Sequence, residues 1–415
     1  MKKISIIVLM ITAILIASAA CAPAPTATPV PPTAVPPTAV PATKAPEPTK
    51  APTVAPTAIP PTLAPTLAPT LVPPTLVPPT TVPTVAAPKP ADASTLLAIK
   101  VTTAPKLDAL ADDAAWKTAP ELKVSAAGGK NFKDGSGSTT ATLKAVYTSD
   151  TIYFLLQYDD PTLSARRLPF VKQVDGSWKK LLDPDDPTNT DNNKYYEDKV
   201  AMIWTINNSI KGFDTTGCFS VCHAGEPNKP YGNKYTATPG ELGDIWHWKS
   251  VRTGSVGQID DQFLDDTRWD KDKAANAGRK SDPHTAGGYS DIALKDGKPE
   301  FMSKDAKPAN AGGTYWLKDS DKVAFDDSKF KPGDEVASIL VAPQTGDAGD
   351  IPDVSLWKDG KWTIAFSRKL TTDSKNTDVQ FDKLDGTYYF GIAFFDNAQV
   401  RHAFNNGALK LQFAK

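Results

Sequence analysis

The chain has 415 residues, with 46 basic and 47 acidic side chains and a formal net charge of -1. This balance leaves no basic field to attract a polyanion, so we expect no nucleic-acid partner. The length suggests at most two domains once a proline-rich segment is set aside. The three cysteines are Cys21, Cys218 and Cys222. An odd count in an exported protein means that one of them needs its own explanation.

Residues 1–20 have the pattern of a secretory signal peptide. Two lysines precede an apolar run, and small residues come just before Cys21. The run is shorter than the roughly 20 apolar residues of a membrane-spanning helix. We predict that Cys21 carries the lipid of an exported lipoprotein, although Ser18 stands where that motif usually has leucine. Ordinary cleavage nearby and an uncleaved anchor are the alternatives. The expected location is extracytoplasmic and membrane-anchored, in a periplasm or on a cell surface.

Residues 21–93 are predicted to form a disordered tether rich in Pro, Thr and Ala. They hold 23 of the chain's 38 prolines and no aromatic side chain. Such a segment cannot bury enough apolar surface to offset the entropy of folding, so it should be an extended spacer. A proline-rich ligand for a partner protein is the less favoured alternative.

Residues 94–415 are predicted to form one all-β domain, an antiparallel β-sandwich. Alternating runs rich in β-branched and aromatic residues are typical of strands, and turn residues separate them. These runs cover residues 141–147, 151–158, 199–204, 335–341, 362–366, 388–395 and 408–413. Three polar stretches, 160–197, 208–243 and 254–333, are predicted to be long loops, which tend to carry function in compact domains. Their aspartates, including Asp183, Asp185, Asp186, Asp260, Asp261, Asp265 and Asp266, are interpreted as solvated, with calcium binding as the alternative.

The central polar stretch contains Cys218-Phe219-Ser220-Val221-Cys222-His223. Two cysteines followed by a histidine match the covalent haem attachment signature, with one more residue between the cysteines than in the common form. Two thiols bond the vinyl groups of the porphyrin while His223 ligates the iron. If the segment is helical, Cys218 and Cys222 share a face. A local disulfide and a zinc site are the alternatives.

A six-coordinate iron needs a second axial ligand. His402, at the end of a predicted hairpin, is one candidate, and Arg401 beside it can pair with a haem propionate. His247 lies between Trp246 and Trp248, which pack in the core or against the porphyrin. In an alternating strand His247 points away from both tryptophans. A buried core histidine and a surface loop histidine are the simpler interpretations of His247 and His402. Met202 is interpreted as a core residue, with iron ligation as the alternative, and His284 is interpreted as part of a turn.

Residues 94–415 resemble the haem-binding domain related to the γ subunit of ethylbenzene dehydrogenase, and the c-type cytochromes grouped with it. The resemblance rests on segments of the domain spread along its length, namely 105–108 with 115–116, 150–154, 198–204, the cysteine motif with Ala224-Gly225, 244–249, and 395–397 with 401–402. The γ subunits hold a b-type haem through a methionine and a lysine and lack the cysteine pair. This chain departs toward the c-type members. The resemblance implies covalent haem on Cys218 and Cys222 and axial ligands His223 and His402, with His247 in a supporting role.

The predicted function is electron transfer by one covalently bound haem c, without catalysis by the chain itself. Arg401 and Lys249 are the expected partners of the propionates. The partner is expected to be a redox protein, such as a molybdenum oxidoreductase or a respiratory complex, and the lipid would hold the chain at a membrane. One alternative is a stalked carbohydrate-binding module on a β-sandwich, in which the two cysteines form a disulfide. The other is a haem subunit of a molybdenum oxidoreductase complex.

Overall fold

The computed structural model describes residues 88–185, 192–221 and 234–414. The chain divides into two units, Met1–Thr80 and Thr81–Lys415, and all described residues belong to the second. Cys21, Asp186, Cys222 and His223 lie outside the described residues. No helix of the described residues is long and apolar enough to cross a membrane.

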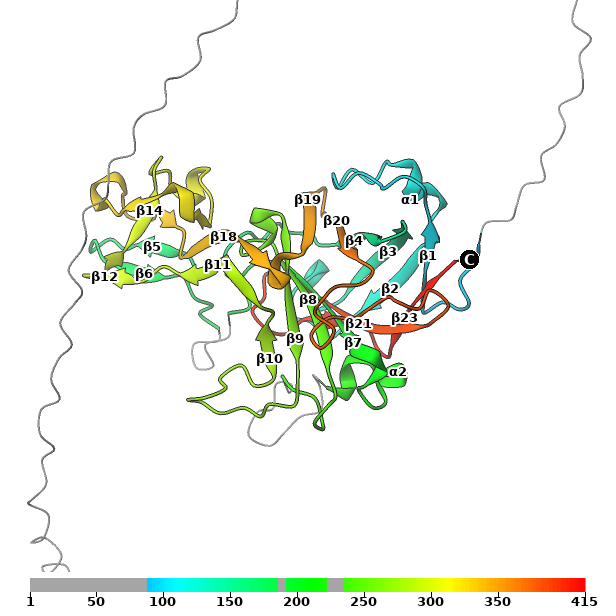
Figure 1. The fold of residues 1–415 in the computed structure, drawn as a ribbon. Helices are drawn as coiled ribbons and strands as arrows, with labels where there is room; N and C mark the ends of the chain where they lie inside the picture. The colour runs from blue at the N-terminus through cyan, green and yellow to red at the C-terminus, as the bar shows by residue number, and fades with distance from the viewer. Residues whose placement is uncertain (1–87, 186–191, 222–233, 415) are drawn as a thin grey trace, which may run out of the picture. The chain divides into compact units, whose positions relative to one another are not determined.

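The largest sheet has thirteen strands (Figure 1). Its members are β1 (Thr95–Lys100), β2 (Leu122–Ala126), β3 (Thr139–Tyr147), β4 (Thr151–Asp159), β7 (Lys199–Thr205), β8 (Gly243–Lys249), β9 (Gln258–Leu264), β10 (Arg279–Ser281), β19 (Ile351–Lys358), β20 (Lys361–Lys369), β21 (Tyr388–Phe395), β22 (Ala403–Phe404) and β23 (Leu409–Phe413). Burial alternates along several of them, as in β2 and β3, because successive side chains point to opposite faces.

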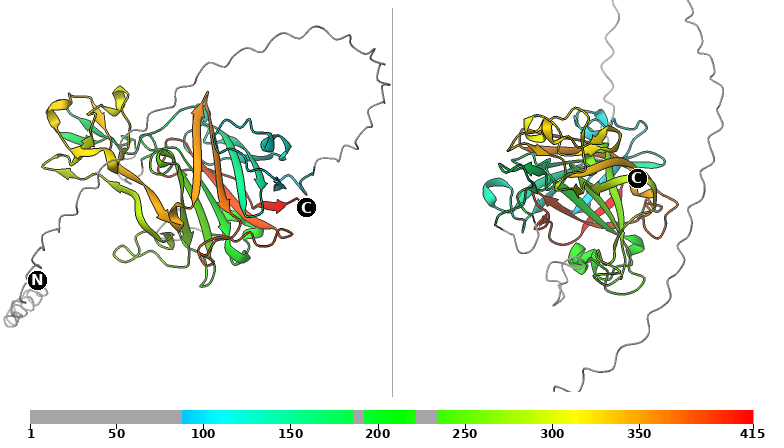
Figure 2. Two further views of the ribbon diagram at one scale, coloured as in Figure 1. Left: turned by 45° about the horizontal axis from the view of Figure 1, so that its top comes forward. Right: turned by 90° about the vertical axis from the view of Figure 1, so that its left-hand side faces the viewer.

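Ten of these strands close into a ring through their pairings. Figure 2 shows the ribbon from two further directions. The order is β1-β23-β21-β7-β8-β9-β19-β20-β4-β3, and β1 completes the ring by pairing in parallel with both β23 and β3. The prediction of an all-β fold is confirmed. A sandwich of two separate sheets is not, because the hydrogen bonds pass from one wall to the other through β1 and through two residue pairs between β9 and β19.

The remaining strands form small sheets of two or three strands, several of which pack around a second core. They are β5 (Phe170–Lys172), β6 (Trp178–Lys180), β11 (His284–Asp291), β12 (Leu294–Lys295), β13 (Lys298–Pro299), β14 (Phe301–Ser303), β15 (Leu317–Lys318), β16 (Lys322–Ala324), β17 (Glu335–Val336) and β18 (Ile339–Gly346). Phe170, Trp178 and Phe330 are among the buried residues of this second core.

Helices in the described residues are all short. Two are α-helical, α1 (Ala114–Thr118) and α2 (Phe213–Thr216). The others are 3₁₀ turns: η1 (Lys133–Gly135), η2 (Ile206–Asn208), η3 (Gly217–Ser220), η4 (Gly254–Val256), η5 (Ala309–Ala311), η6 (Asp319–Asp321), η7 (Asp327–Lys329) and η8 (Asp347–Gly349). Asp113 caps α1 by accepting a hydrogen bond from the backbone N–H of Ala115.

The prediction of a long loop over residues 254–333 is wrong. The stretch 254–333 contains β9, a central strand of the ring, together with β10 to β16. Asp260 and Asp261 of β9 are 1% and 0% exposed, so they do not belong to a solvated acidic loop. The charge of Asp260 is offset by its ion pair with Lys249. Asp261 lies 3.7 Å from Arg368, which also faces Asp244 and Asp378. Asp183 is also buried, and His284 opens strand β11 rather than forming a turn.

Candidate functional site

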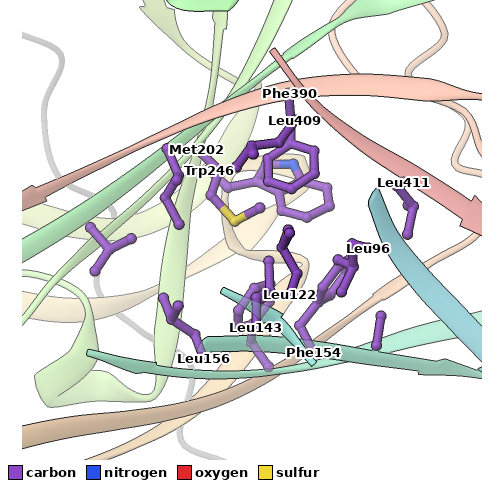
Figure 3. Close-up of a cluster of buried hydrophobic side chains, with 14 of the residues drawn as sticks. Leu96, Leu122, Leu143, Phe154, Leu156, Met202, Trp246, Phe390, Leu409 and Leu411 are labelled. Atoms are coloured by element: carbon purple, nitrogen blue, oxygen red, sulfur yellow. The ribbon is translucent and has the colours of Figure 1, made fainter. Parts of the chain in front are cut away.

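The inside of the ring is filled by side chains. Met202 and Trp246 enter the core from one wall, facing Leu143, Phe154 and Leu156 of the other (Figure 3). The interior cavity beside them is only about 10 Å³. That is about the space for one water molecule, so a porphyrin does not fit there.

Three residues that the sequence analysis considers for the haem site lie in this core. Met202, Trp246 and Trp248 are at most 2% exposed and belong to the main core. They therefore point away from the other face of β7 and β8, which is the face that His247 occupies, as the alternation of the strand predicted. Met202 as an iron ligand and the two tryptophans as walls of a haem site do not agree with this placement.

The strands β21, β7 and β8 present three rows of side chains on the side turned away from the core. We call this surface the outer face. Residues opposite one another in the register share a row, because paired positions point to the same side of a sheet. The rows are Gly391, Ile203 and Ile245; then Ala393, Ala201 and His247; then Phe395, Lys199 and Lys249.

Cys218 packs against the first row. It lies in η3, is 7% exposed, and belongs to an apolar cluster with Ile203 and Ile245. Gly391 makes this approach possible, because a Cβ at that position would lie 3.3 Å from the Cβ of Cys218 and 3.6 Å from its Sγ. Gly217 is needed as well, since its φ is +58° and a Cβ there would meet the carbonyl oxygen of Gly407 at 2.5 Å. Two glycines thus seat the thiol on the outer face.

His247 stands in the second row, between Ala201 of β7 and Asp260 of β9. Its side chain is 7% exposed, and neither ring nitrogen has a hydrogen-bond partner among the described residues. Burial lowers the pKa of His247 well below its usual value, and the charges of Lys249 and Lys199 add to the effect. The imidazole is therefore neutral, with a bare acceptor nitrogen, which is the state in which histidine binds a metal.

His402 lies close to the third row, beyond the end of β21. Its ring centroid is 4.8 Å from that of Phe395 and 5.9 Å from that of Phe404. The ring of His247 lies 6.1 Å from Phe395 on its own side. Both histidine rings therefore lie near Phe395. His402 is only half-buried, whereas His247 is enclosed.

The cations near the third row differ from those expected. Lys249 is 1% exposed and already forms an ion pair with Asp260. Arg401 is exposed, and its carbonyl oxygen accepts a hydrogen bond from Lys130. Lys199 was not named from the sequence. Its Nζ lies 4.0 Å from the centroid of Phe395 and donates to the carbonyl oxygen of Gln399 at 3.0 Å.

Lys199 is the better partner for an acidic group on this face. It is 3% exposed, and no carboxylate pairs with it at ion-pair distance among the described residues. Burial lowers the pKa of Lys199 well below its usual range, and Arg252 reinforces the effect. An anionic ligand would restore the charged form. The only signal in the sequence is a lysine inside a strand that is otherwise apolar.

A larger hollow lies beside the outer face, at the edge formed by β9 and β10. It is an open cavity of about 560 Å³ lined by Gln262, Arg279, Lys280 and Ser281, among others. Gln262 pairs with Ile245 of the first row, so the hollow borders that face. The residues predicted for the site do not line it.

The chain is an all-β protein with a cysteine-bearing segment seated on the outside of a closed sheet. The family model described as ethylbenzene dehydrogenase matches residues 113–407. The chain belongs to this family, which confirms the resemblance found from its sequence motifs. None of the curated proteins matches the chain.

Three solved structures are similar to the chain. A carbohydrate binding module of family 9 from Caldicellulosiruptor kristjanssonii, in complex with glucose, is 6% identical over 77% of this chain and 95% of that one, with a TM-score of 0.30. The module in complex with cellotriose is 8% identical with the same coverage and a TM-score of 0.29. A putative carbohydrate-binding protein from Bacteroides uniformis is 11% identical over 77% and 99%, with a TM-score of 0.30. Scores this low carry no argument about function.

Proposed function

We propose that the chain is a c-type cytochrome that carries electrons through one haem bound over the outer face. The observation that carries this proposal is that Cys218 and His247 occupy neighbouring rows of that face. A buried thiol and a buried neutral imidazole without a partner are the two kinds of group that covalent haem attachment requires. The filled core supports the outer face as the location.

Each residue has a defined task in this proposal. Cys218 and Cys222 each add a thiol S–H across one vinyl group of the porphyrin, so that no atom is lost and the chain gains the mass of the whole haem. His223 ligates the iron through a ring nitrogen. Ala201 and Ala393, the small residues in the row of His247, would lie under the haem, and Lys199 offers a charge to a propionate. When bound, the haem supplies reversible one-electron transfer.

His247 or His402 is the second axial ligand, and two observations support His247. It is nine-tenths buried, and leaving two ring nitrogens unpaired there costs free energy unless a ligand uses one of them. It also lies one row from Cys218, whereas His402 lies two rows away, beside Phe395. His402 remains the ligand that the family resemblance implies.

Export and anchoring complete the proposal. Residues 1–20 direct the chain out of the cytoplasm, a lipid on Cys21 holds it at a membrane, and residues 21–93 act as a spacer. About 70 residues at ~3.1 Å each give a reach on the order of 200 Å. The domain would then exchange electrons with a redox partner, for which a molybdenum oxidoreductase or a respiratory complex is our candidate.

Intact mass and a pyridine haemochrome spectrum test the proposal directly. Protein made in a host competent for cytochrome maturation should carry one haem that survives denaturation, and Cys218→Ala should weaken this covalent retention. His247→Ala and His402→Ala are compared next, because only loss of the true ligand converts a low-spin spectrum to a high-spin one. Colourless protein with the mass of the bare chain would refute the proposal.

The exposed side chains give little support to the alternative function, a carbohydrate-binding module. Such modules present tryptophans to sugar rings, but of the nine tryptophans of the chain only Trp269 is largely exposed, at 44%. A disulfide between Cys218 and Cys222 would lower the mass by two hydrogens, so the mass measurement also decides between the two functions.

A further inference from the structure

A group of buried carboxylates closes one end of the ring. Asp244 of β8, Asp261 of β9 and Asp378 each offer an oxygen, and these oxygens lie within 4.8 Å of one another. All three residues are 0% exposed. Asp282 and Asp350 interact electrostatically with the same group. We call these five aspartates, together with Arg368, the Arg368 cluster.

The Arg368 cluster holds far more negative than positive charge. Arg368 is fully buried and is the one cation among the described residues that pairs with these carboxylates. Its guanidinium lies 2.7 Å from Asp378 but 3.7 Å from both Asp244 and Asp261. Five ionised carboxylates against one guanidinium would leave an excess of four negative charges, and burial raises the pKa of Asp244, Asp261, Asp282 and Asp350 accordingly. Buried charges of this kind are either paired, bound to a metal, or neutralised by protons.

Many oxygens of the Arg368 cluster also lack a hydrogen-bond donor. Among the described residues, no donor reaches either carboxylate oxygen of Asp261 or Asp282, or one oxygen each of Asp244 and Asp350. Asp261 and Asp282 are 0% and 1% exposed, so water does not replace the missing donors. Asp261 therefore offers buried oxygens that no donor reaches, and one of its oxygens lies within 4.8 Å of oxygens of Asp244 and Asp378. Oxygen ligands of this kind are what a hard cation such as Ca²⁺ takes.

The other end of the ring provides a comparison. Asp160, Asp198 and Asp396 also lie within 4.8 Å of one another and are buried. There, Asp198 accepts hydrogen bonds from the backbone N–H groups of Ser164 and Asn397 and from the indole of Trp362. Asp396 accepts from Phe132 and Thr162. Protein donors therefore reach Asp198 and Asp396 in this second group. In the Arg368 cluster they reach Asp244 and Asp378, but not Asp261 or Asp282.

We infer that the Arg368 cluster is a calcium site, with Asp244, Asp261 and Asp378 as ligands and Asp282 and Asp350 completing the shell. An all-oxygen, all-carboxylate set favours Ca²⁺ over zinc, which prefers nitrogen and sulfur. The ion joins β8 and β9 to the segment before β21 and to the start of β19. It thereby reinforces the β9–β19 seam, which only two residue pairs hold together. This inference does not depend on haem.

The test uses the full chain, freed of metal with EGTA and exchanged into chelator-free buffer. We expect it to take up Ca²⁺, and its Tm to rise by about 5 °C when Ca²⁺ is about 100-fold above its dissociation constant. Tb³⁺ is a second probe, because the Cζ of Arg368 lies 5.4 Å from the ring centroid of Trp246. Excitation of that indole should produce terbium luminescence that Ca²⁺ competes away.

The decisive variant is Asp261→Asn, and its matched control is Asp359→Asn in the exposed β19–β20 turn. Asp261→Asn should bind one Ca²⁺ fewer per chain than wild type and lose the rise in Tm, whereas Asp359→Asn should keep both. If Asp261→Asn does not fold, metal content and luminescence of the wild type decide. Protons neutralise the cluster instead if Ca²⁺ leaves the wild-type Tm unchanged and Tb³⁺ gives no sensitised emission. Retention of the ion by folded Asp261→Asn would also overturn the assignment.

Discussion

Replacing His247 with leucine should stabilise the haem-free chain. The buried imidazole loses its hydrogen bonds to water at both ring nitrogens and gains none from the described residues. An unsatisfied buried polar group costs roughly 1–3 kcal/mol. Leucine has a similar volume and no polar atom, so His247→Leu should raise the free energy of unfolding by about 1–3 kcal/mol.

The measurement is urea denaturation of protein made without cytochrome maturation, at pH 8, where histidine is neutral in the unfolded chain. His284→Leu is the control. That side chain is exposed at the start of β11, so its replacement should change stability by no more than about 0.5 kcal/mol. A loss of more than about 1 kcal/mol on His247→Leu would refute the reasoning, because it would show that the ring nitrogens are hydrogen-bonded. The haem-loaded variant should in turn lose the low-spin spectrum.

Three further predictions concern the scaffold of the site. Gly391→Val should lower the free energy of unfolding by about 1–3 kcal/mol in urea denaturation and reduce haem retention, because its side chain displaces Cys218; unchanged values would contradict the 3.3 Å contact. Leu143→Ala, at a fully buried core position, should cost about 2–5 kcal/mol in the same assay, and a loss below 1 kcal/mol would mean that the core collapses around the gap. Burial raises the pKa of Asp353 from 3.8 to about 7, so its ionised form destabilises the fold. Near pH 4, Asp353→Asn should therefore have about the same free energy of unfolding as the wild type. As the pH rises the variant should become the more stable of the two, by up to about 4 kcal/mol once the pH exceeds 7. A difference that does not vary with pH would refute ionisation of Asp353 as its cause.

The sequence identifies those strands whose alternation is apolar. Residues 388–395 were predicted as a strand and form β21, and residues 151–158 form nearly all of β4. The sequence does not predict strand β9, because three consecutive polar residues, Asp260 to Gln262, interrupt its alternating pattern. Their surroundings come from other strands: Lys249 of β8 pairs with Asp260, and Arg368 of β20 lies 3.7 Å from Asp261. A local pattern does not contain that information.

In the candidate site, too, some features follow from the local sequence and others depend on the folded structure. The cysteine motif and the opposite orientations of His247 and Trp246 follow from spacing alone. The seat for Cys218 does not, because it depends on Gly391, which lies 173 positions later in the chain and becomes its neighbour only in the folded sheet. Lys199 was missed for a related reason, since its isolation from carboxylates is a property of the packed structure.

The way β1 closes the ring has a mechanical consequence. The strand begins at Thr95, directly after the proline-rich segment, and pairs in parallel with β23 over four residues and with β3 over two. Tension applied from the N-terminal side pulls β1 along its own length, so these ladder hydrogen bonds resist together in shear rather than opening one at a time like a zipper. A domain attached only through its N-terminal segment would therefore resist a pulling force at β1. Its lifetime under that force would be set by the rate of forced unfolding.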